Sequence, residues 1–202
     1  MLTKIKIAVF VSGGGTNLQA LIDAEKRGEI KSGTIALVLS DKPQAYALER
    51  AKNAGIPTAV LERKAFASQG EYEDAIAALL KEKGIGLIVL ASFMRILGEN
   101  FTKRFDRRII NVHPSLIPSF CGEGFYGLKV HEAALEKGVK VTGATVHFVN
   151  EIPDGGEIIM QKAVCVRPGD TPEVLQKRVM QEAEWIILPQ ATEYVCNQML
   201  NN

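Results

Sequence analysis

The chain has 202 residues, of which 47% are hydrophobic, and its formal net charge is +1 at pH 7. This length and apolar content predict a single domain over residues 1–202, while the near-neutral charge excludes a strongly basic nucleic-acid-binding surface. The N-terminal apolar run lacks a small-residue cleavage site, and no apolar stretch is long enough to span a membrane, so we expect a cytoplasmic protein.

Short apolar runs alternate with longer amphipathic segments over the first half of the chain. Spacing of apolar residues at helical intervals predicts helices at 17–28, 45–55 and 71–84, each closed by a glycine. The apolar runs predict strands at 6–12, 34–40, 57–61, 87–91 and 108–112. Because these strands are continuously apolar and alternate with helices, we expect a Rossmann-like α/β fold. Its sheet should be mostly parallel, with helices on both faces.

The pattern changes after residue 112. A loop over 113–127 contains two prolines and three glycines, and a short helix is predicted at 130–138. Two strand-like runs, 141–149 and 156–166, predict a C-terminal antiparallel strand pair added to the sheet. A last helix is predicted from Thr171, which can cap it, to about residue 191, with a bend before Pro189.

A glycine-rich loop joins the first strand to the first helix. Its sequence, SGGGTN, places Gly13, Gly14, Gly15, Thr16 and Asn17 at a helix N-terminus, where backbone N–H groups and the helix dipole favour an anion. A monophosphate suits this loop better than a nucleotide, because the sequence matches neither a Walker A loop nor the full dinucleotide fingerprint. The alternative is a tight turn that binds no ligand.

An amide and an imidazole follow the fifth predicted strand. Asn111 and His113 are two residues apart in an extended segment, so they face the same side, and Pro114 keeps His113 extended. The carboxyl ends of parallel strands bind ligands, and the glycine loop lies at the same edge. An amide N–H that donates to an oxyanion and an imidazole that moves or donates a proton suit acyl transfer. The alternative for His113 is a loop histidine bonded to a backbone carbonyl.

A carboxylate lies in the turn between the last two predicted strands. Asp154 is bracketed by Pro153, Gly155 and Gly156, and from this turn it can reach a neighbouring imidazole and favour its charged form. The alternative is an ordinary Asp-Gly hairpin residue. His131 and His147 are interpreted as structural.

Metal binding and disulfides are not predicted. The three histidines lack HExxH spacing, and the chain contains no CxxC pair, so we expect no metal site. Cys121, Cys165 and Cys196 are interpreted as reduced thiols.

Taken in chain order, five motifs resemble those of the phosphoribosylglycinamide formyltransferase family. They are SGGGTNLQALI, ASFMRIL, INVHPSLIPSF, VTGATVHFV and the PDGG turn. The resemblance runs from about residue 4 to residue 189. It implies the formyltransferase fold and transfer of a formyl group from 10-formyltetrahydrofolate, as co-substrate, to the primary amine of glycinamide ribonucleotide. It implies no metal, small-molecule substrates, and a monomer or homodimer.

The resemblance also implies roles for individual residues. Asn111, His113 and Asp154 would be the catalytic set. The ribonucleotide would contact Gly13, Gly14, Gly15, Thr16, Asn17, Gln181 and Glu184. The folate would contact Met94, Arg95, Ile96, Leu97, Asn111, Asn150, Glu151, Ile152, Pro153 and Asp154.

The sequence departs from the family pattern at two places. The loop CGEGFYGLKVH, which includes Cys121, is longer than the family's usual loop, and Gln69 stands nearest to an arginine that some members carry. Rival functions are a formyltetrahydrofolate deformylase, a methionyl-tRNA formyltransferase and a non-catalytic protein that binds a phosphorylated metabolite. The deformylase and the methionyl-tRNA formyltransferase are disfavoured because the extra domains expected of them are missing. The Asn-x-His-Pro motif disfavours the non-catalytic binding protein.

Overall fold

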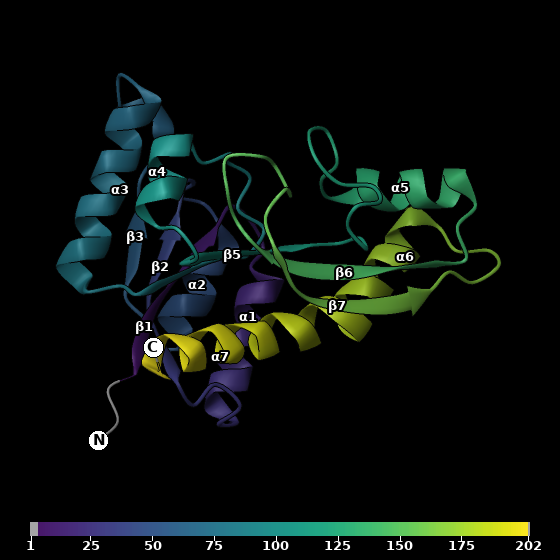
Figure 1. Ribbon diagram of the computed structural model, residues 1–202, viewed down its shortest axis with the longest axis horizontal. Coiled ribbons are helices and arrows are strands. Elements are labelled where there is room, and N and C mark those ends of the chain that lie inside the picture. Colours follow the sequence, from purple (N-terminus) through teal and green to yellow (C-terminus); the bar gives the residue numbers. More distant parts are fainter. Residues whose placement is uncertain (1–3, 202) are drawn as a thin grey trace.

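The computed structural model describes residues 4–201, in which seven strands form one sheet in the order β3-β2-β1-β4-β5-β6-β7 (Figure 1). The strands are β1 (Ile5–Val11), β2 (Gly33–Ser40), β3 (Thr58–Val60), β4 (Leu87–Leu90), β5 (Ile109–His113), β6 (Val141–Phe148) and β7 (Ile158–Cys165). The first five are parallel, whereas β6 runs antiparallel to β5 and β7 antiparallel to β6. The predicted sheet, including its antiparallel end, is confirmed.

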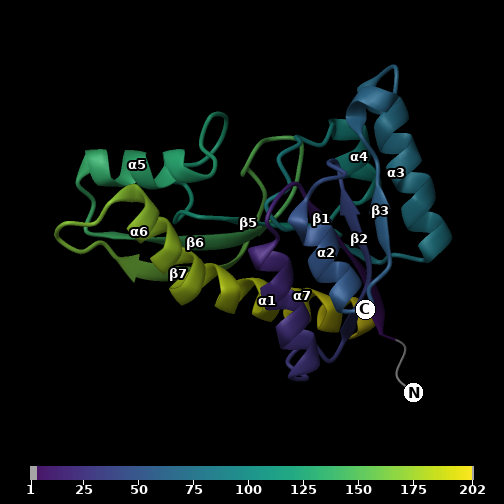
Figure 2. The same cartoon turned by 180° about the vertical axis from the view of Figure 1, so that it is seen from behind.

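Helices cover both faces of the sheet. They are α1 (Thr16–Lys26), α2 (Tyr46–Asn53), α3 (Gln69–Lys83), α4 (Glu99–Arg104), α5 (Leu128–Lys137), α6 (Pro172–Val179) and α7 (Trp185–Asn201), with a 3₁₀ turn at Arg63–Ala65 and a π turn at Met180–Glu184. One apolar cluster joins the sheet to α1, α2, α6 and α7, and a second joins it to α3 and α4. Figure 2 shows this face from behind, where α1 contacts both α2 and α7. The buried strands therefore carry apolar residues on both faces, as their sequences predicted.

The C-terminal helix differs from its prediction. It is interrupted by the π turn Met180–Glu184, continues through Pro189 and ends at Asn201 rather than near residue 191. Val195 and Cys196 are buried, so packing against the sheet sustains the extra turns. The short helix α4 and the 3₁₀ turn were not predicted, because segments of six and three residues carry too little apolar periodicity.

The sheet order brings three loops to one edge. Strands β1, β4 and β5 are neighbours, so the glycine loop, the segment 92–97 and the end of β5 emerge side by side at their carboxyl ends. Strand β6 then pairs with β5 so that Asn111 lies opposite His147 and His113 opposite Thr145. This register brings a second imidazole to the same edge.

Candidate active site

A cavity of about 790 Å³ lies at this edge of the sheet. Most of the predicted site residues line it: Thr16, Asn17, Met94, Arg95, Ile96, Leu97, Asn111, His113, Asn150, Pro153, Asp154 and Glu184. Six predicted residues are not among its lining: Gly13, Gly14, Gly15, Glu151, Ile152 and Gln181. Segments far apart in the sequence therefore converge on one space, with the glycine loop at its margin.

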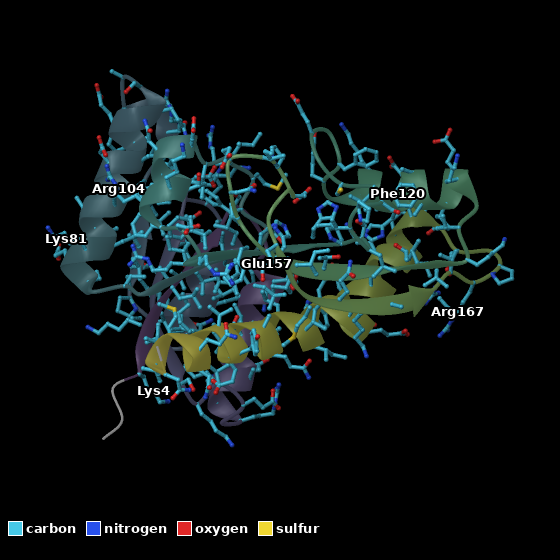
Figure 3. All side chains as sticks on the ribbon, viewed as in Figure 1. Lys4, Lys81, Arg104, Phe120, Glu157 and Arg167 are labelled. Atoms are coloured by element: carbon cyan, nitrogen blue, oxygen red, sulfur yellow. The ribbon has the colours of Figure 1, made fainter. Side chains whose placement is uncertain are left out.

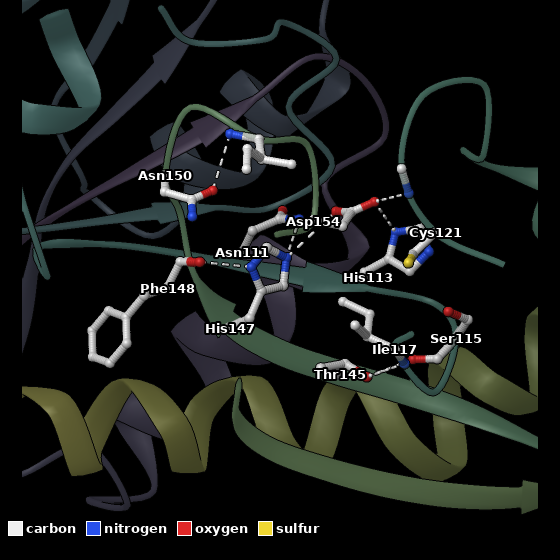
Figure 4. Close-up of polar contacts among 12 residues, drawn as sticks. Asn111, His113, Ser115, Ile117, Cys121, Thr145, His147, Phe148, Asn150 and Asp154 are labelled. Carbon is white, nitrogen blue, oxygen red and sulfur yellow. Dashed lines mark hydrogen bonds and ion pairs between the residues drawn. The ribbon is translucent and has the colours of Figure 1, made fainter. Parts of the chain in front are cut away.

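Asp154 lies between two imidazoles (Figure 4). Its carboxylate oxygens are 3.3 Å from His113 Nδ1 and 3.4 Å from His147 Nε2, and all three side chains are largely buried. The turn that carries Asp154 is specified by its sequence. Asp154 has φ 56°, and a Cβ at Gly156 would lie 1.8 Å from the carbonyl oxygen of Phe148, so only glycine fits there.

Burial and charge act in opposite directions on these groups. Burial acts to raise the pKa of Asp154, but the adjacent His147 side chain, the charge of His113 and the Gly122 amide together lower that pKa below its ordinary value. Burial lowers the pKa of His113, and Asp154 and the Phe120 carbonyl partly offset this effect. Asp154 is therefore ionised at neutral pH and favours a proton on His113.

His147 is the site residue that the sequence interpretation missed. Its Nδ1 donates to the Phe148 carbonyl oxygen at 2.7 Å, and its Nε2 lies 3.3 Å from Asn111 Nδ2. It therefore contacts both Asn111 and Asp154. The sequence interpretation treated this residue as structural. The pairing of β6 with β5, which places His147 opposite Asn111, was the signal that could have located it.

The glycine loop is held in place by α2. Gly15 has φ 73°, and an added Cβ there would lie 2.6 Å from Ala47 Cβ, so the close approach requires glycine. The Gly13 carbonyl accepts from the Ala47 amide at 3.0 Å, and the Gly14 carbonyl accepts from Arg50 Nε at 2.8 Å. Arg50 thereby brings a positive charge to a loop at a helix N-terminus, which favours an anion.

The π turn directs a buried carboxyl toward the same loop. Glu184 Oε2 accepts from Asn17 Nδ2 at 2.7 Å. Burial raises the pKa of Glu184 to about 7, although the Asn17 hydrogen bond acts to lower it. Gln176, Met180 and Glu184 line the cavity at intervals of four residues, so they share a face of the helix. Gln181 is one step away from that face and exposed, which explains why the structure does not bring it to the cavity.

The segment after β4 forms another wall of the cavity. Met94 and Ile96 are exposed apolar side chains, whereas Leu97 is buried. Ser12 Oγ accepts from the Met94 amide at 2.9 Å, and Arg95 Nε lies 3.0 Å from Oδ2 of the buried Asp41. This wall offers apolar surface and a fixed cation. Gln69 Nε2 donates to the Ile96 carbonyl oxygen at 3.4 Å.

His131 is fully buried on α5, beside the cavity. Among the described residues, neither of its ring nitrogens has a hydrogen-bond partner. Burial lowers the pKa of His131 to about 4, and the charge of His113 adds to this lowering. The folded chain therefore holds His131 neutral at pH values where an unfolded histidine is charged.

We expect His131 to make the fold less stable in mild acid. Between its ordinary pKa near 6.5 and the folded value of about 4, the unfolded chain binds a proton that the folded chain does not, so stability falls as pH falls through this window. At pH 5 this group makes the free energy of unfolding about 2 kcal/mol lower than it is at neutral pH. Urea unfolding of the wild type and His131→Leu at pH 7 and pH 5 measures it. The variant should lose less stability on acidification, and an equal loss in both chains would contradict this assignment.

Residues 4–201 carry neither a metal-binding cluster nor a membrane-spanning helix. No group of three or more His, Cys, Asp or Glu side chains within this range is arranged to hold a metal ion. No helix within it combines the length and apolar character needed to cross a bilayer.

Comparison with known proteins gives consistent matches. The family model described as formyl transferase matches residues 5–192. Phosphoribosylglycinamide formyltransferase of Haemophilus influenzae is 47% identical over 184 residues, which cover 91% of this chain and 84% of that protein. The trifunctional purine biosynthetic protein adenosine-3 of Gallus gallus is 46% identical over 96% of this chain, but the match spans 19% of that longer protein.

Solved structures agree with the sequence matches. Glycinamide ribonucleotide transformylase 1 from Symbiobacterium toebii superposes with a TM-score of 0.90 at 42% identity, covering 96% of this chain and 89% of that one. Phosphoribosylglycinamide formyltransferase from Brucella melitensis gives a TM-score of 0.88 at 42% identity, covering 96% of both chains. Because the family model matches residues 5–192 and a relative is 47% identical over 91% of the chain, the chain belongs to the formyl transferase family.

Proposed function

We propose that this enzyme transfers the formyl group of 10-formyltetrahydrofolate to the primary amine of N1-(5-phospho-D-ribosyl)glycinamide, in the synthesis of purines. The observation that carries the proposal is one cavity lined both by Asn111, His113 and Asp154 and by Thr16 and Asn17 at the end of the glycine loop. Membership of the formyl transferase family and the names of the full-length relatives support the same reaction.

The ribonucleotide enters from the side of α1. Its phosphate is held by the glycine loop and by Thr16, where the helix N-terminus and Arg50 favour an anion. Glu184 lies beside Asn17 and is the carboxyl available to meet the glycinamide amine. With a pKa of about 7, Glu184 can hold or release a proton near neutral pH.

The folate enters from the opposite side. Its apolar ring system packs on Met94, Ile96 and Leu97, and its polar edge meets backbone groups of the 92–97 and 150–154 segments. A carboxylate on the folate tail is complementary to Arg95, which Asp41 holds in place. The two ligands then meet beside Asn111 and His113.

The reaction itself needs no covalent enzyme intermediate. The glycinamide amine attacks the formyl carbon, and a tetrahedral intermediate with a negative oxygen forms. Asn111 donates an N–H to that oxygen, and His113, held by Asp154, lies beside it and places a positive charge there when its imidazole is protonated. The bond from the formyl carbon to N10 breaks, while the amine loses one proton and N10 gains one. Holding both reactants together could contribute several kcal/mol to the lowering of the barrier.

The whole chain acts as one formyltransferase domain, and it works in the cytoplasm, where soluble folates and ribonucleotides meet. It acts on small molecules without nucleic acid, membrane or metal.

A formyl-transfer assay with and without the ribonucleotide tests the proposal. The expected result is tetrahydrofolate production that depends on the ribonucleotide and matches the formylated product in amount. Formate release without the ribonucleotide would favour the deformylase reaction instead. Binding of either ligand without any turnover would favour a non-catalytic binding protein.

Thr16→Val should raise the KM for the ribonucleotide about tenfold. The change keeps the side-chain shape and removes a hydroxyl at the helix N-terminus, and a hydrogen bond to a charged group contributes about 1.5–3 kcal/mol. Steady-state kinetics with each substrate varied in turn measures this effect. The KM for the folate should stay unchanged, and an effect confined to the folate KM would contradict the placement of the phosphate.

A further inference from the structure

The loop that follows β5 contacts both members of the His113–Asp154 pair through its backbone. The Phe120 carbonyl oxygen lies 2.8 Å from His113 Nε2, and the Gly122 amide donates to Asp154 Oδ2 at 2.9 Å. Figure 3 labels Phe120 in this loop, and Figure 4 shows Cys121 beside His113, with the dashed line from the loop amide to Asp154. Two backbone groups, two residues apart, thus meet two neighbouring side chains of the catalytic set.

The loop conformation is specific to these contacts. Phe120 has φ 51° and Gly122 has φ 88°, so the backbone is in the left-handed region on both sides of Cys121. A non-glycine residue in this region is strained and persists only where its surroundings hold it. The loop is tied from within: Ser119 donates its amide to the Leu116 carbonyl at 3.0 Å, and its own carbonyl accepts from Ser115 Oγ at 2.6 Å.

The contacts favour one protonation state of the pair. An ionised carboxylate and a peptide carbonyl can only accept hydrogen bonds, and they face the two ring nitrogens of His113. A neutral imidazole has one N–H and would turn a lone pair toward one of these oxygens. The imidazolium donates to both. The Gly122 amide donates to the same carboxylate and favours its ionised form.

We propose that the Phe120 carbonyl and the Gly122 amide are positioning groups for formyl transfer. They act through His113 and Asp154, holding the imidazole and the carboxylate in the orientation in which they face the reacting carbon. This inference rests on the proposed function, because formyl transfer is the reaction in which these two groups would act. It gives the CGEGFYG loop a role that its side chains do not reveal.

Two glycines of the loop provide a matched test. Gly122 and Gly124 share a φ of 88°, and a Cβ added at either would meet no atom within 4 Å, so alanine brings the same backbone strain to both. Only the Gly122 amide contacts Asp154. Gly122→Ala should lower kcat tenfold or more, because a small displacement of catalytic groups has an effect of about this size on the rate. Each KM should stay within about twofold of the wild type. Gly124→Ala should keep kcat within about twofold. Equal loss of kcat in the two variants, or an unchanged kcat in Gly122→Ala, would overturn the proposal.

A spectroscopic measurement examines the contact without turnover. In amide NMR spectra of the full chain, Asp154→Ala should move the Gly122 proton upfield by removing its acceptor, while the Gly124 proton stays in place. An unmoved Gly122 proton would reject the contact even if Gly122→Ala did not fold. If the wild type transferred no formyl group but the Gly122 proton still responded, the proposed function would fail on its own.

Discussion

Asp154→Asn should lower kcat for formyl transfer by about 10³-fold while the chain keeps its fold. Asparagine matches the size of the side chain and can still accept from the Gly122 amide, but it carries no charge to hold a proton on His113. General acid–base groups and fixed charges at such sites each contribute about 10²–10⁴ in rate. Steady-state formyl transfer gives the rate, and near-ultraviolet circular dichroism checks that the packing is intact.

Glu157→Gln is the matched control for this change. Glu157 lies in the same connection between β6 and β7, immediately before β7, and Figure 3 labels it there. It is exposed and pairs with Arg107 at the surface, so the same change of charge should leave kcat within about twofold. A similar loss in both variants would show that the net charge of the hairpin matters rather than the carboxylate between the imidazoles. Asp154→Asn with kcat within tenfold of the wild type would remove Asp154 from the catalytic set.

The parts of the site that the sequence could predict are those determined by local patterns. Apolar runs and glycine-closed helices located the parallel strands, and the carboxyl-end rule then placed the glycine loop and the end of β5 at one edge. Alternation along β5, with Pro114 after His113, was enough to put Asn111 and His113 on one side. Each of these inferences uses residues close together in the chain.

The parts that it could not predict depend on contacts between distant segments or on backbone atoms. His147 enters the site because β6 pairs with β5 in one particular register, which alternation alone does not fix. The π turn brings Glu184 to Asn17 and leaves Gln181 outside the cavity. A π turn winds one residue wider than an α-helix, and the sequence pattern does not reveal this difference. Phe120 and Gly122 act through a carbonyl and an amide, which every residue of this loop possesses.

Asn111→Ala should lower kcat by about 10²–10³-fold with little change in either KM. The amide is placed at the end of β5 to donate to the oxygen that becomes negative only as the tetrahedral intermediate forms, so its loss raises the barrier more than it weakens binding. His113→Ala should cause a loss of at least this size, because it removes the charge beside the same oxygen and leaves Asp154 without that partner. Steady-state kinetics of both variants, with each substrate varied, measures the two losses.

The double variant Asn111→Ala, His113→Ala decides whether the two groups act on one oxygen. If they stabilise the same developing charge, the second substitution removes less than it does alone, since residues that work as a unit are far from additive. The double variant should then be only slightly slower than His113→Ala. Fully additive losses would mean that the amide and the imidazole serve separate steps, with Asn111 at the oxyanion and His113 moving the proton between the amine and N10. A rise in the folate KM alone, with kcat preserved, would instead reduce Asn111 to a binding residue.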